Sequence, residues 1–362
     1  MFNSRLLLNA NTFSTHYIIK IIVGNLLCIL FCFISNNRVY AQGCCSGGSG
    51  SPIAGGTSQG VLLDRQIEIS TNYQYINSKK FLSGTKDTSN FLDNYNSQYF
   101  YTRFAYGLTK NLTMSLESGY YLNRSQVGLH HSYVQQCSGI GDLILFPRYD
   151  VYNHNTEKTR NEITLGLGLK LPLGKYLDSF VTYTDPHSKR SYYAPMAPAV
   201  MPSTGSNDFI FYGFGYRGYP SHNFRIFTSL LYVKKGWNAL GEKFGDYSSI
   251  GIFAGKTFFR KLGITFQLKG EWVETMKTDK NVDLTIKYFN INYMKDYYGL
   301  DVNSTGGKKI LFVPQVNYSY KSLSVYALSE FPLYQYVNGT AIASQYLFTI
   351  GIAYRFMTVK VD

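Results

Sequence analysis

About twelve segments of this chain alternate apolar with polar residues, and this pattern limits the possible folds more than any other feature. In the clearest segment, aliphatic residues from Ile163 to Leu171 share one face, while Glu162, Lys170 and two glycines share the other. A period of two residues indicates β-strands. These strands exceed the usual ~5–6 residues, so we expect them to cross a membrane at a tilt.

The expected strands form an all-β, transmembrane outer-membrane β-barrel of about 12 antiparallel strands, within a range of about 10–14. An even number is usual for single-chain bacterial barrels. We expect strands at residues 64–77, 95–108, 111–123, 139–152, 161–173, 207–218, 222–234, 246–258, 261–273, 309–321, 322–335 and 344–356.

The connections between these segments alternate in length. Long ones follow the odd-numbered strands, and short ones such as Thr109-Lys110 and Phe259-Arg260 follow the even-numbered strands, with 153–160 as an exception. Outer-membrane barrels have this arrangement, with short periplasmic turns and long extracellular loops. The long connections are 78–94, 124–138, 174–206, 235–245, 274–308 and 336–343.

Composition supports strands and excludes other classes. The chain has 33 Tyr, 25 Phe and 33 Gly among 362 residues, but only 16% charged residues. No uncharged apolar run reaches the ~18 residues that a membrane helix needs. The formal charge of +13 comes from scattered Lys and Arg, so we expect no nucleic-acid partner.

Aromatic residues near the strand ends predict two girdles at the membrane surfaces. Prolines inside four expected strands predict bulges or strand ends, because proline cannot donate a ladder hydrogen bond. One girdle contains Tyr106, Phe224, Phe258, Tyr320 and Phe356; the other contains Tyr75, Tyr121 and Trp272. The prolines are Pro147, Pro172, Pro314 and Pro332.

Residues 1–41 have the features of an export signal. Arg5 and Lys20 precede an uncharged apolar run from Ile21 to Ser35, and Val39-Tyr40-Ala41 offers a cleavage site. We expect a Gly/Ser-rich periplasmic segment at 42–60, the barrel at 61–356, and a short tail at 357–362. The compartment is then the outer membrane of a Gram-negative bacterium.

Strand parity places charged side chains of both signs on the inner face of the barrel. They either line a polar passage or satisfy one another across a narrow interior, and balanced charge disfavours a strongly ion-selective pore. Gly166 and Gly168 face the same way and are expected to leave open space. The inward charges are Glu68, Arg103, Asp142, Arg148, Asp150, Glu162, Lys170, Arg225, Lys269, Glu271, Glu330 and Arg355.

No catalytic or cofactor site is expected. Cys44 and Cys45 are weak candidates for a soft-metal site, but Cys137 lies at the other end of the expected barrel. No histidine falls in the middle of an expected strand, so no positioned base would activate a nucleophile.

Several stretches resemble the outer-membrane transporter-like family labelled for the MetA pathway of phenol degradation. They are 139–143 (GIGDL), 169–174 (LKLPLG), 203–208 (STGSND), 323–327 (LSVYA) and 332–340 (PLYQYVNGT). That family is similar to the FadL-type channels, which implies uptake of hydrophobic or aromatic compounds across the outer membrane.

The sequence therefore predicts a monomeric, lipid-embedded barrel that conducts small hydrophobic or aromatic solutes. The alternative is a structural or surface-interaction barrel that does not transport and presents the Tyr-rich loops 174–206 and 274–308. A clear lumen favours the first function, and a packed lumen with ordered protruding loops favours the second.

Overall fold

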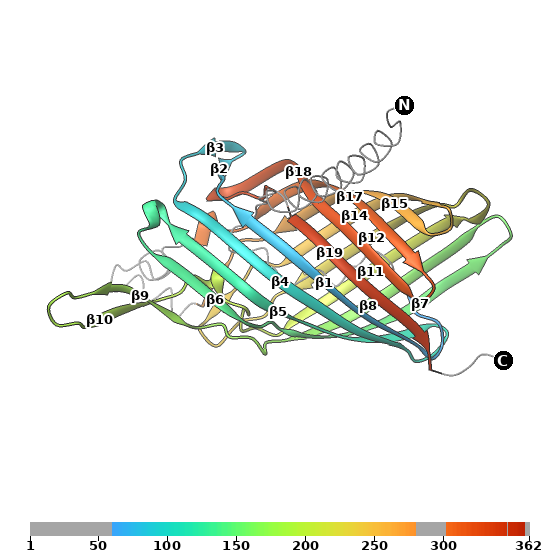
Figure 1. The fold of residues 1–362 in the computed structure, drawn as a ribbon, viewed down its shortest axis with the longest axis horizontal. Coiled ribbons are helices and arrows are strands. Elements are labelled where there is room, and N and C mark those ends of the chain that lie inside the picture. The colour runs from blue at the N-terminus through green and yellow to red at the C-terminus, as the bar shows by residue number, and fades with distance from the viewer. Residues whose placement is uncertain (1–59, 280–301, 346, 359–362) are drawn as a thin grey trace, which may run out of the picture. The chain divides into compact units, whose positions relative to one another are not determined.

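The computed structural model describes residues 60–279, 302–345 and 347–358. Residue contacts divide the chain into two units, Met1–Arg38 and Val39–Asp362, and every described residue belongs to the second. That unit is a closed, antiparallel 12-strand β-barrel, which confirms the predicted fold class (Figure 1). The expected export signal and the Gly/Ser-rich segment up to residue 59 lie outside the described residues.

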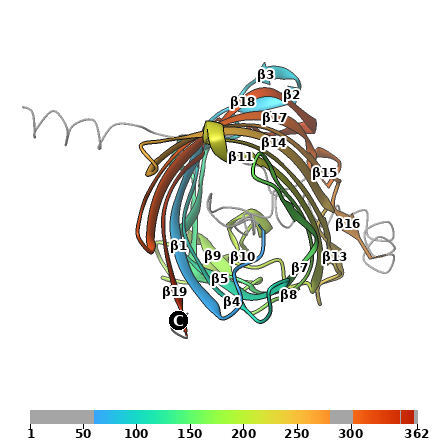
Figure 2. The ribbon, with the colours of Figure 1, turned by 90° about the vertical axis from the view of Figure 1, so that its right-hand side faces the viewer.

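Each barrel strand overlaps one predicted segment. The strands are β1 (Gln66–Ser78), β4 (Leu92–Gly107), β5 (Leu112–Gly128), β7 (Leu143–Asn155), β8 (Arg160–Leu171), β11 (Asp208–Tyr219), β12 (Phe224–Lys234), β14 (Tyr247–Phe258), β15 (Leu262–Val273), β17 (Gly307–Tyr320), β18 (Leu323–Ile342) and β19 (Leu347–Met357). The first and last strands close the ring, from Gln66 opposite Met357 to Ile76 opposite Leu347 (Figure 2).

The two faces of the barrel differ as the alternation predicts. On β8, Leu165 and Leu167 point outward and are 51% and 62% exposed, whereas Thr164, the residue before Leu165, is fully buried. Outward aliphatic and aromatic side chains recur on every barrel strand. An apolar surface of this extent is stable only against lipid or another apolar partner.

Among the residues that the structure describes, no helix is long and apolar enough to cross a membrane.

The connections at one end of the barrel are all short turns, and those at the other end are long except for the one between β18 and β19, residues 343–346. The long connection predicted at 336–343 is therefore wrong. Residues 108–111, 156–159, 220–223, 259–261 and 321–322 form the short turns, at the end where β1 begins and β19 ends. The connection predicted at 153–160 shortens to a turn at 156–159, because β7 continues to Asn155.

The long-loop end carries small elements of its own. They are β2 (Phe81–Gly84), β3 (Lys86–Thr88), η1 (Leu129–His131), β6 (Val134–Ile140), β9 (Ser179–Thr184), β10 (Ser191–Pro195), η2 (Pro198–Val200), β13 (Glu242–Lys243), β16 (Lys277–Thr278) and η5 (Val302–Ser304). The β9–β10 hairpin belongs to loop 172–207, and β6 pairs with the part of β5 that extends past the start of β7 at Leu143.

The prolines behave in two ways. Pro172 follows the last residue of β8, and a register shift in the β17–β18 pair falls beside Pro332, as predicted. Pro147 and Pro314 lie inside β7 and β17 with no register shift beside them, so the bulges expected there are wrong. Tyr121 is also misplaced in the predicted girdle, because its side chain faces inward and is 2% exposed.

Candidate functional site: the barrel interior and its long-loop mouth

The charged residues predicted on the inner face are buried or half-buried in the barrel, and most of them lie in three clusters. In the first, the Glu68 carboxylate bridges two arginines from the neighbouring strands β4 and β19. Arg103 donates to one oxygen, and Arg355 Nε lies 2.6 Å from the other. Because Glu68 is fully buried, both cations offset the cost of removing its charge from water.

A second cluster joins β15, β17 and β18. The two carboxylate oxygens of Glu271 lie 2.7 Å from Lys269 Nζ and 2.8 Å from Lys309 Nζ. Lys269 Nζ also lies 2.9 Å from Glu330 Oε1. The sequence prediction missed Lys309, although its odd position on β17 gives the same inward parity as Leu311 and Val313.

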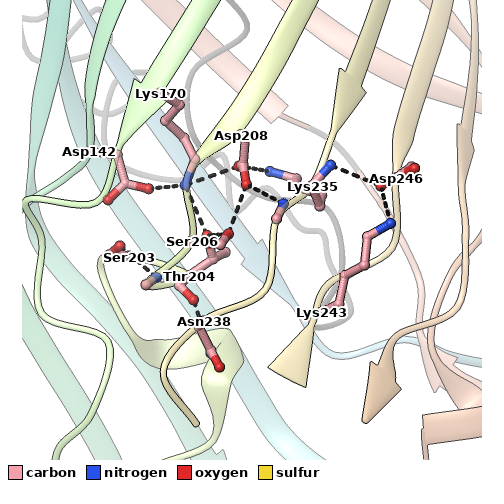
Figure 3. A network of polar contacts seen from close by, with 12 residues as sticks. Asp142, Lys170, Ser203, Thr204, Ser206, Asp208, Lys235, Asn238, Lys243 and Asp246 are labelled. Atoms are coloured by element: carbon pink, nitrogen blue, oxygen red, sulfur yellow. Dashed lines mark hydrogen bonds and ion pairs between the residues drawn. The ribbon is translucent and has the colours of Figure 1, made fainter. Parts of the chain in front are cut away.

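The third cluster lies where β8, β11 and β12 reach the long-loop end, and Figure 3 shows its residues. Lys170 Nζ stands 2.5 Å from Asp142 and 3.0 Å from Asp208, and Lys235 contacts the same oxygen of Asp208 at 2.9 Å. The prediction contained Asp142 and Lys170 but not Asp208 or Lys235. The sequence did offer a signal for Asp208, because this residue ends the STGSND stretch.

The remaining predicted charges lie outside these clusters. Asp150 accepts a hydrogen bond from Asn153 at 2.8 Å, and Glu162 pairs with Arg160 at 3.2 Å. The Arg148 guanidinium lies 5.9 Å from the ring centre of Phe146. Arg225 donates to Thr257 at 3.0 Å and, more weakly, to Thr265 at 3.4 Å.

Three of the quoted sequence stretches meet at the third cluster. Asp142 belongs to GIGDL, Lys170 to LKLPLG and Asp208 to STGSND. Lys170 Nζ also donates to Thr204 Oγ1 at 2.9 Å, and Ser206 donates to Asp208 at 2.7 Å. Stretches far apart in the sequence thus form one buried polar site that fixes the end of loop 172–207.

The preceding part of that loop, residues 196–201, is apolar and buried. Val200 is fully buried and Met201 is 1% exposed, and both pack against Cys137. Ala199 packs instead against Phe81 on β2 and Ile342 on β18. The segment therefore contacts both β6 and the β2–β18 side of the long-loop end.

Polar side chains of the barrel hold this apolar segment by its backbone. Arg124 Nη1 donates to the Met201 carbonyl at 2.5 Å, and the Ala197 N–H donates to Gln135 Oε1 at 2.7 Å. The segment is thus anchored to β5 and β6 on one side and, through Thr204, to Lys170 on β8. A short, well-anchored stretch of this kind can narrow the mouth.

The barrel interior is apolar along one contiguous arc of its wall. Seven buried side chains form a single cluster, with Phe227 and others packed against it. Phe227 also stacks on Phe253, with ring centres 4.2 Å apart and planes 17° apart. These side chains face the interior and do not contact lipid. Contact with lipid therefore does not explain why they are apolar. The seven residues are Ile144, Phe146, Ile210, Tyr212, Phe214, Leu231 and Val233.

The chain enters the barrel from its short-turn end. The Leu62 N–H donates to Thr113 Oγ1 at 2.7 Å in a buried contact, and Leu62 is 3% exposed. Gly60, the first described residue, lies against the inward side chains of Glu162 and Phe214.

Asp246 lies in the connection before β14 and has a shifted pKa. Partial burial favours a higher pKa for Asp246, but the Lys235 N–H, the Lys243 ammonium and the Tyr232 hydroxyl lower it below the ordinary value. These groups lie at 2.8, 3.1 and 3.0 Å. Ionised Asp246 therefore holds both ends of loop 235–246.

The structure does not bring the candidate metal ligands or a serine–histidine pair together in a buried site within the described residues. Cys44 and Cys45 lie outside the described residues, and Cys137 is a buried free thiol. In the described part of the chain, no three potential metal ligands gather. Ser221 Oγ contacts His222 Nδ1 at 2.9 Å, but the two are neighbours in an exposed turn.

No protein-family model and no curated protein matches the sequence. Among solved structures, the chain is similar to the COG4313 outer membrane channel from Pseudomonas putida F1, with a TM-score of 0.57 and 11% identity over 83% of this chain and 98% of that one. At this identity the similarity concerns the fold, which is that of an outer-membrane β-barrel.

Two looser similarities carry no argument. A FadL homologue from Pseudomonas aeruginosa has a TM-score of 0.41 and 9% identity, over 88% of this chain and 99% of that one. The translocator domain of the autotransporter NalP from Neisseria meningitidis has a TM-score of 0.43 and 10% identity, over 81% and 90%. The family suggested by the short sequence stretches stays a prediction.

Proposed function

We propose that the protein is an outer-membrane channel for small solutes that have an apolar, often aromatic, body and a polar group. The apolar arc inside the barrel carries this proposal. Inward Tyr212, Phe214, Phe227 and Phe253 make this part of the inner wall aromatic. The rest of the inner wall carries polar side chains, such as Gln315 and Thr265. Binding sites for small organic molecules usually combine apolar walls with a few polar groups.

In this proposal, residues 196–201 form a constriction at the mouth. Their apolar side chains, among them Met196 and Val200, would pass an apolar solute more readily than a hydrated ion. The third charge cluster holds the loop that contains residues 196–201, through the Lys170–Thr204 hydrogen bond. The solute needs no cofactor, and one chain closes the barrel by itself, which agrees with a monomer.

A matched pair of double variants tests the solute class. Phe227→Ala with Phe253→Ala removes a stacked pair from the inner wall, whereas Phe266→Ala with Phe312→Ala removes a stacked pair with 5.9 Å between centres from the outer face. In liposome-swelling assays, we expect the inner variant to lower the rate for phenolic solutes relative to sugars of similar size. The outer variant should leave the ratio unchanged, and equal ratios in all proteins would contradict the proposal.

The orientation is tested by labelling in whole cells. With the natural cysteines Cys44 and Cys45 replaced by serine, a cysteine at Ser188 in the β9–β10 turn should react with an impermeant maleimide. A cysteine at Lys110, in a short turn, should react only after the outer membrane is permeabilised. The reverse result would invert the barrel, and equal labelling would contradict an outer-membrane location.

The exposed aromatic side chains of the β9–β10 hairpin favour a second function. Tyr183, Tyr192 and Tyr193 are 54%, 49% and 66% exposed, and the inner wall is largely buried. Both features fit a barrel that presents a surface rather than a passage. Two results together would favour this function. No solute of any class would cross the wild-type barrel, and deletion of residues 180–194 would leave folding intact but abolish binding of whole cells to other surfaces.

A further inference from the structure

The outward face at the short-turn end carries five exposed cations, which we call the basic rim arc: Arg217, Lys256, Arg260, Lys261 and Lys321. Within the described part of the chain, none of the five forms an ion pair. The inward lysines of the same barrel differ, since Lys170, Lys235 and Lys269 each contact a carboxylate. The turns 220–223, 259–261 and 321–322 contain no Asp or Glu.

Aromatic rings support four of these cations. Lys261 Nζ and Lys321 Nζ lie 5.2 and 5.4 Å from the ring centre of Tyr320. The Arg217 guanidinium lies 5.6 Å from the ring centre of Tyr219, and Lys256 Nζ lies 5.8 Å from that of Phe258. A ring face attracts a cation without neutralising it, so each cation keeps the capacity to bind an anion.

Strand register makes the arc continuous. Phe224 pairs with both Tyr219 and Lys256, and its ring stacks on Tyr219 with centres 6.1 Å apart. Further along, Leu262 pairs with both Phe258 and Tyr318. The Ser319 N–H donates to the Lys261 carbonyl at 2.9 Å. Cations and rings therefore follow one another from β11 to the turn after β17.

We propose that the basic rim arc binds the phosphate headgroups of anionic glycerophospholipids in the leaflet that surrounds the short-turn end. Aromatic residues at a barrel rim lie at headgroup depth, and long basic side chains there extend their charges to the interface. Phe259, at the tip of the turn in the arc, is 88% exposed, as expected for a ring that contacts lipid rather than protein. The proposal requires only that the barrel spans a membrane, so it does not depend on transport.

The central test compares two triple variants with the same loss of charge. The rim variant is Lys256→Gln, Lys261→Gln and Lys321→Gln. The control variant is Lys79→Gln, Lys86→Gln and Lys308→Gln, which removes exposed lysines at the long-loop end. Binding of fluorescent phosphatidylglycerol and phosphatidylcholine is measured on folded protein in neutral detergent, with folding checked by circular dichroism.

Each Lys or Arg near an anionic lipid surface raises the affinity of a protein for that surface roughly fivefold. We therefore expect the rim variant to weaken phosphatidylglycerol binding on the order of 100-fold and the control variant to leave it unchanged. Phosphatidylcholine should bind weakly to all three proteins. Equal weakening in both variants would overturn the proposal, as would equal binding of the two lipids by the wild type.

A single variant tests the role of the rings. Tyr320→Leu keeps every charge but removes the ring face beneath Lys261 and Lys321, so phosphatidylglycerol binding should weaken roughly 2–5-fold. Addition of lipid A, the phosphorylated lipid of the opposite leaflet, should not displace phosphatidylglycerol from the wild type. Complete displacement at equal concentration would assign the arc to lipid A and overturn the proposed lipid.

Discussion

The ring of Phe146 lies over Gly168: a Cβ atom on that glycine would stand 2.9 Å from Phe146 Cδ2. Gly166 makes a similar approach, with a Cβ at 3.0 Å from two atoms of the same ring. The open space expected beside these glycines is therefore filled, and that expectation is wrong. The two glycines on β8 instead seat an aromatic side chain from β7.

This contact predicts that Gly168→Ala destabilises the barrel. The new methyl group would meet Phe146 and also Ile210 Cβ at 3.0 Å, and overpacking of this kind costs about 1–3 kcal/mol. Gly215→Ala is a matched control, because a Cβ there meets nothing within 4 Å. Urea titration of both variants folded into lipid vesicles gives the free energies of unfolding; equal stability would place Phe146 elsewhere.

The lipid-facing side of β8 gives a second prediction. Leu167 is 62% exposed on the outer face in the middle of its strand, so Leu167→Arg should destabilise the barrel by about 2–4 kcal/mol, the usual cost of a midplane cation. Leu323→Arg, at the short-turn rim, should cost only about 0–1 kcal/mol. Vesicle unfolding curves check both, and a neutral Leu167→Arg would exchange the inner and outer faces.

A third prediction concerns the cluster around Asp208. This carboxylate is fully buried and accepts from two lysines, so Asp208→Asn should cost about 3–5 kcal/mol, as for a broken buried pair. Adding Lys235→Met should restore part of the loss, since fewer unneutralised charges then remain. Asp178→Asn, which breaks an exposed pair with Lys175, should cost no more than about 1 kcal/mol. Similar losses for Asp208 and Asp178 would contradict this account.

Loop 235–246 should loosen in acid. The pKa of Asp246 is lower in the folded protein than its ordinary value, so its stabilisation is complete above the unfolded value, about 4. It is then lost as the pH falls further, through the folded pKa. Hydrogen exchange in this loop should rise below about pH 4 in the wild type. Asp246→Asn should show fast exchange already at neutral pH; unchanged exchange in both would exclude a role for this carboxylate.

The sequence predicted the strands well because lipid imposes a rule on every second residue, as at Ile163 to Leu171 on β8. The rule ends where the lipid ends. β18 continues to Ile342, past the predicted end at residue 335, because residues 336–342 pair with β17 and β2 rather than follow an alternation set by lipid.

The site was predicted less completely than the strands. Parity found Asp142 and Lys170, but Lys235 lies just after its strand, where parity gives no direction. The burial of residues 196–201 could not be predicted, because it depends on contacts with β2, β5, β6 and β18. Contacts between such distant segments leave no local pattern.

Because β1 pairs with β19, the barrel wall can close only after the last strand has been added. Ile67 and Phe356, opposite each other in that pair, come from nearly the two ends of the described chain. No sealed wall exists until the last strand is present, and a chain stopped before Leu347 would leave β1 and β18 with open edges that lipid cannot satisfy. The contact between the most distant parts of the sequence thus completes the wall, and contacts of this range are slow to form.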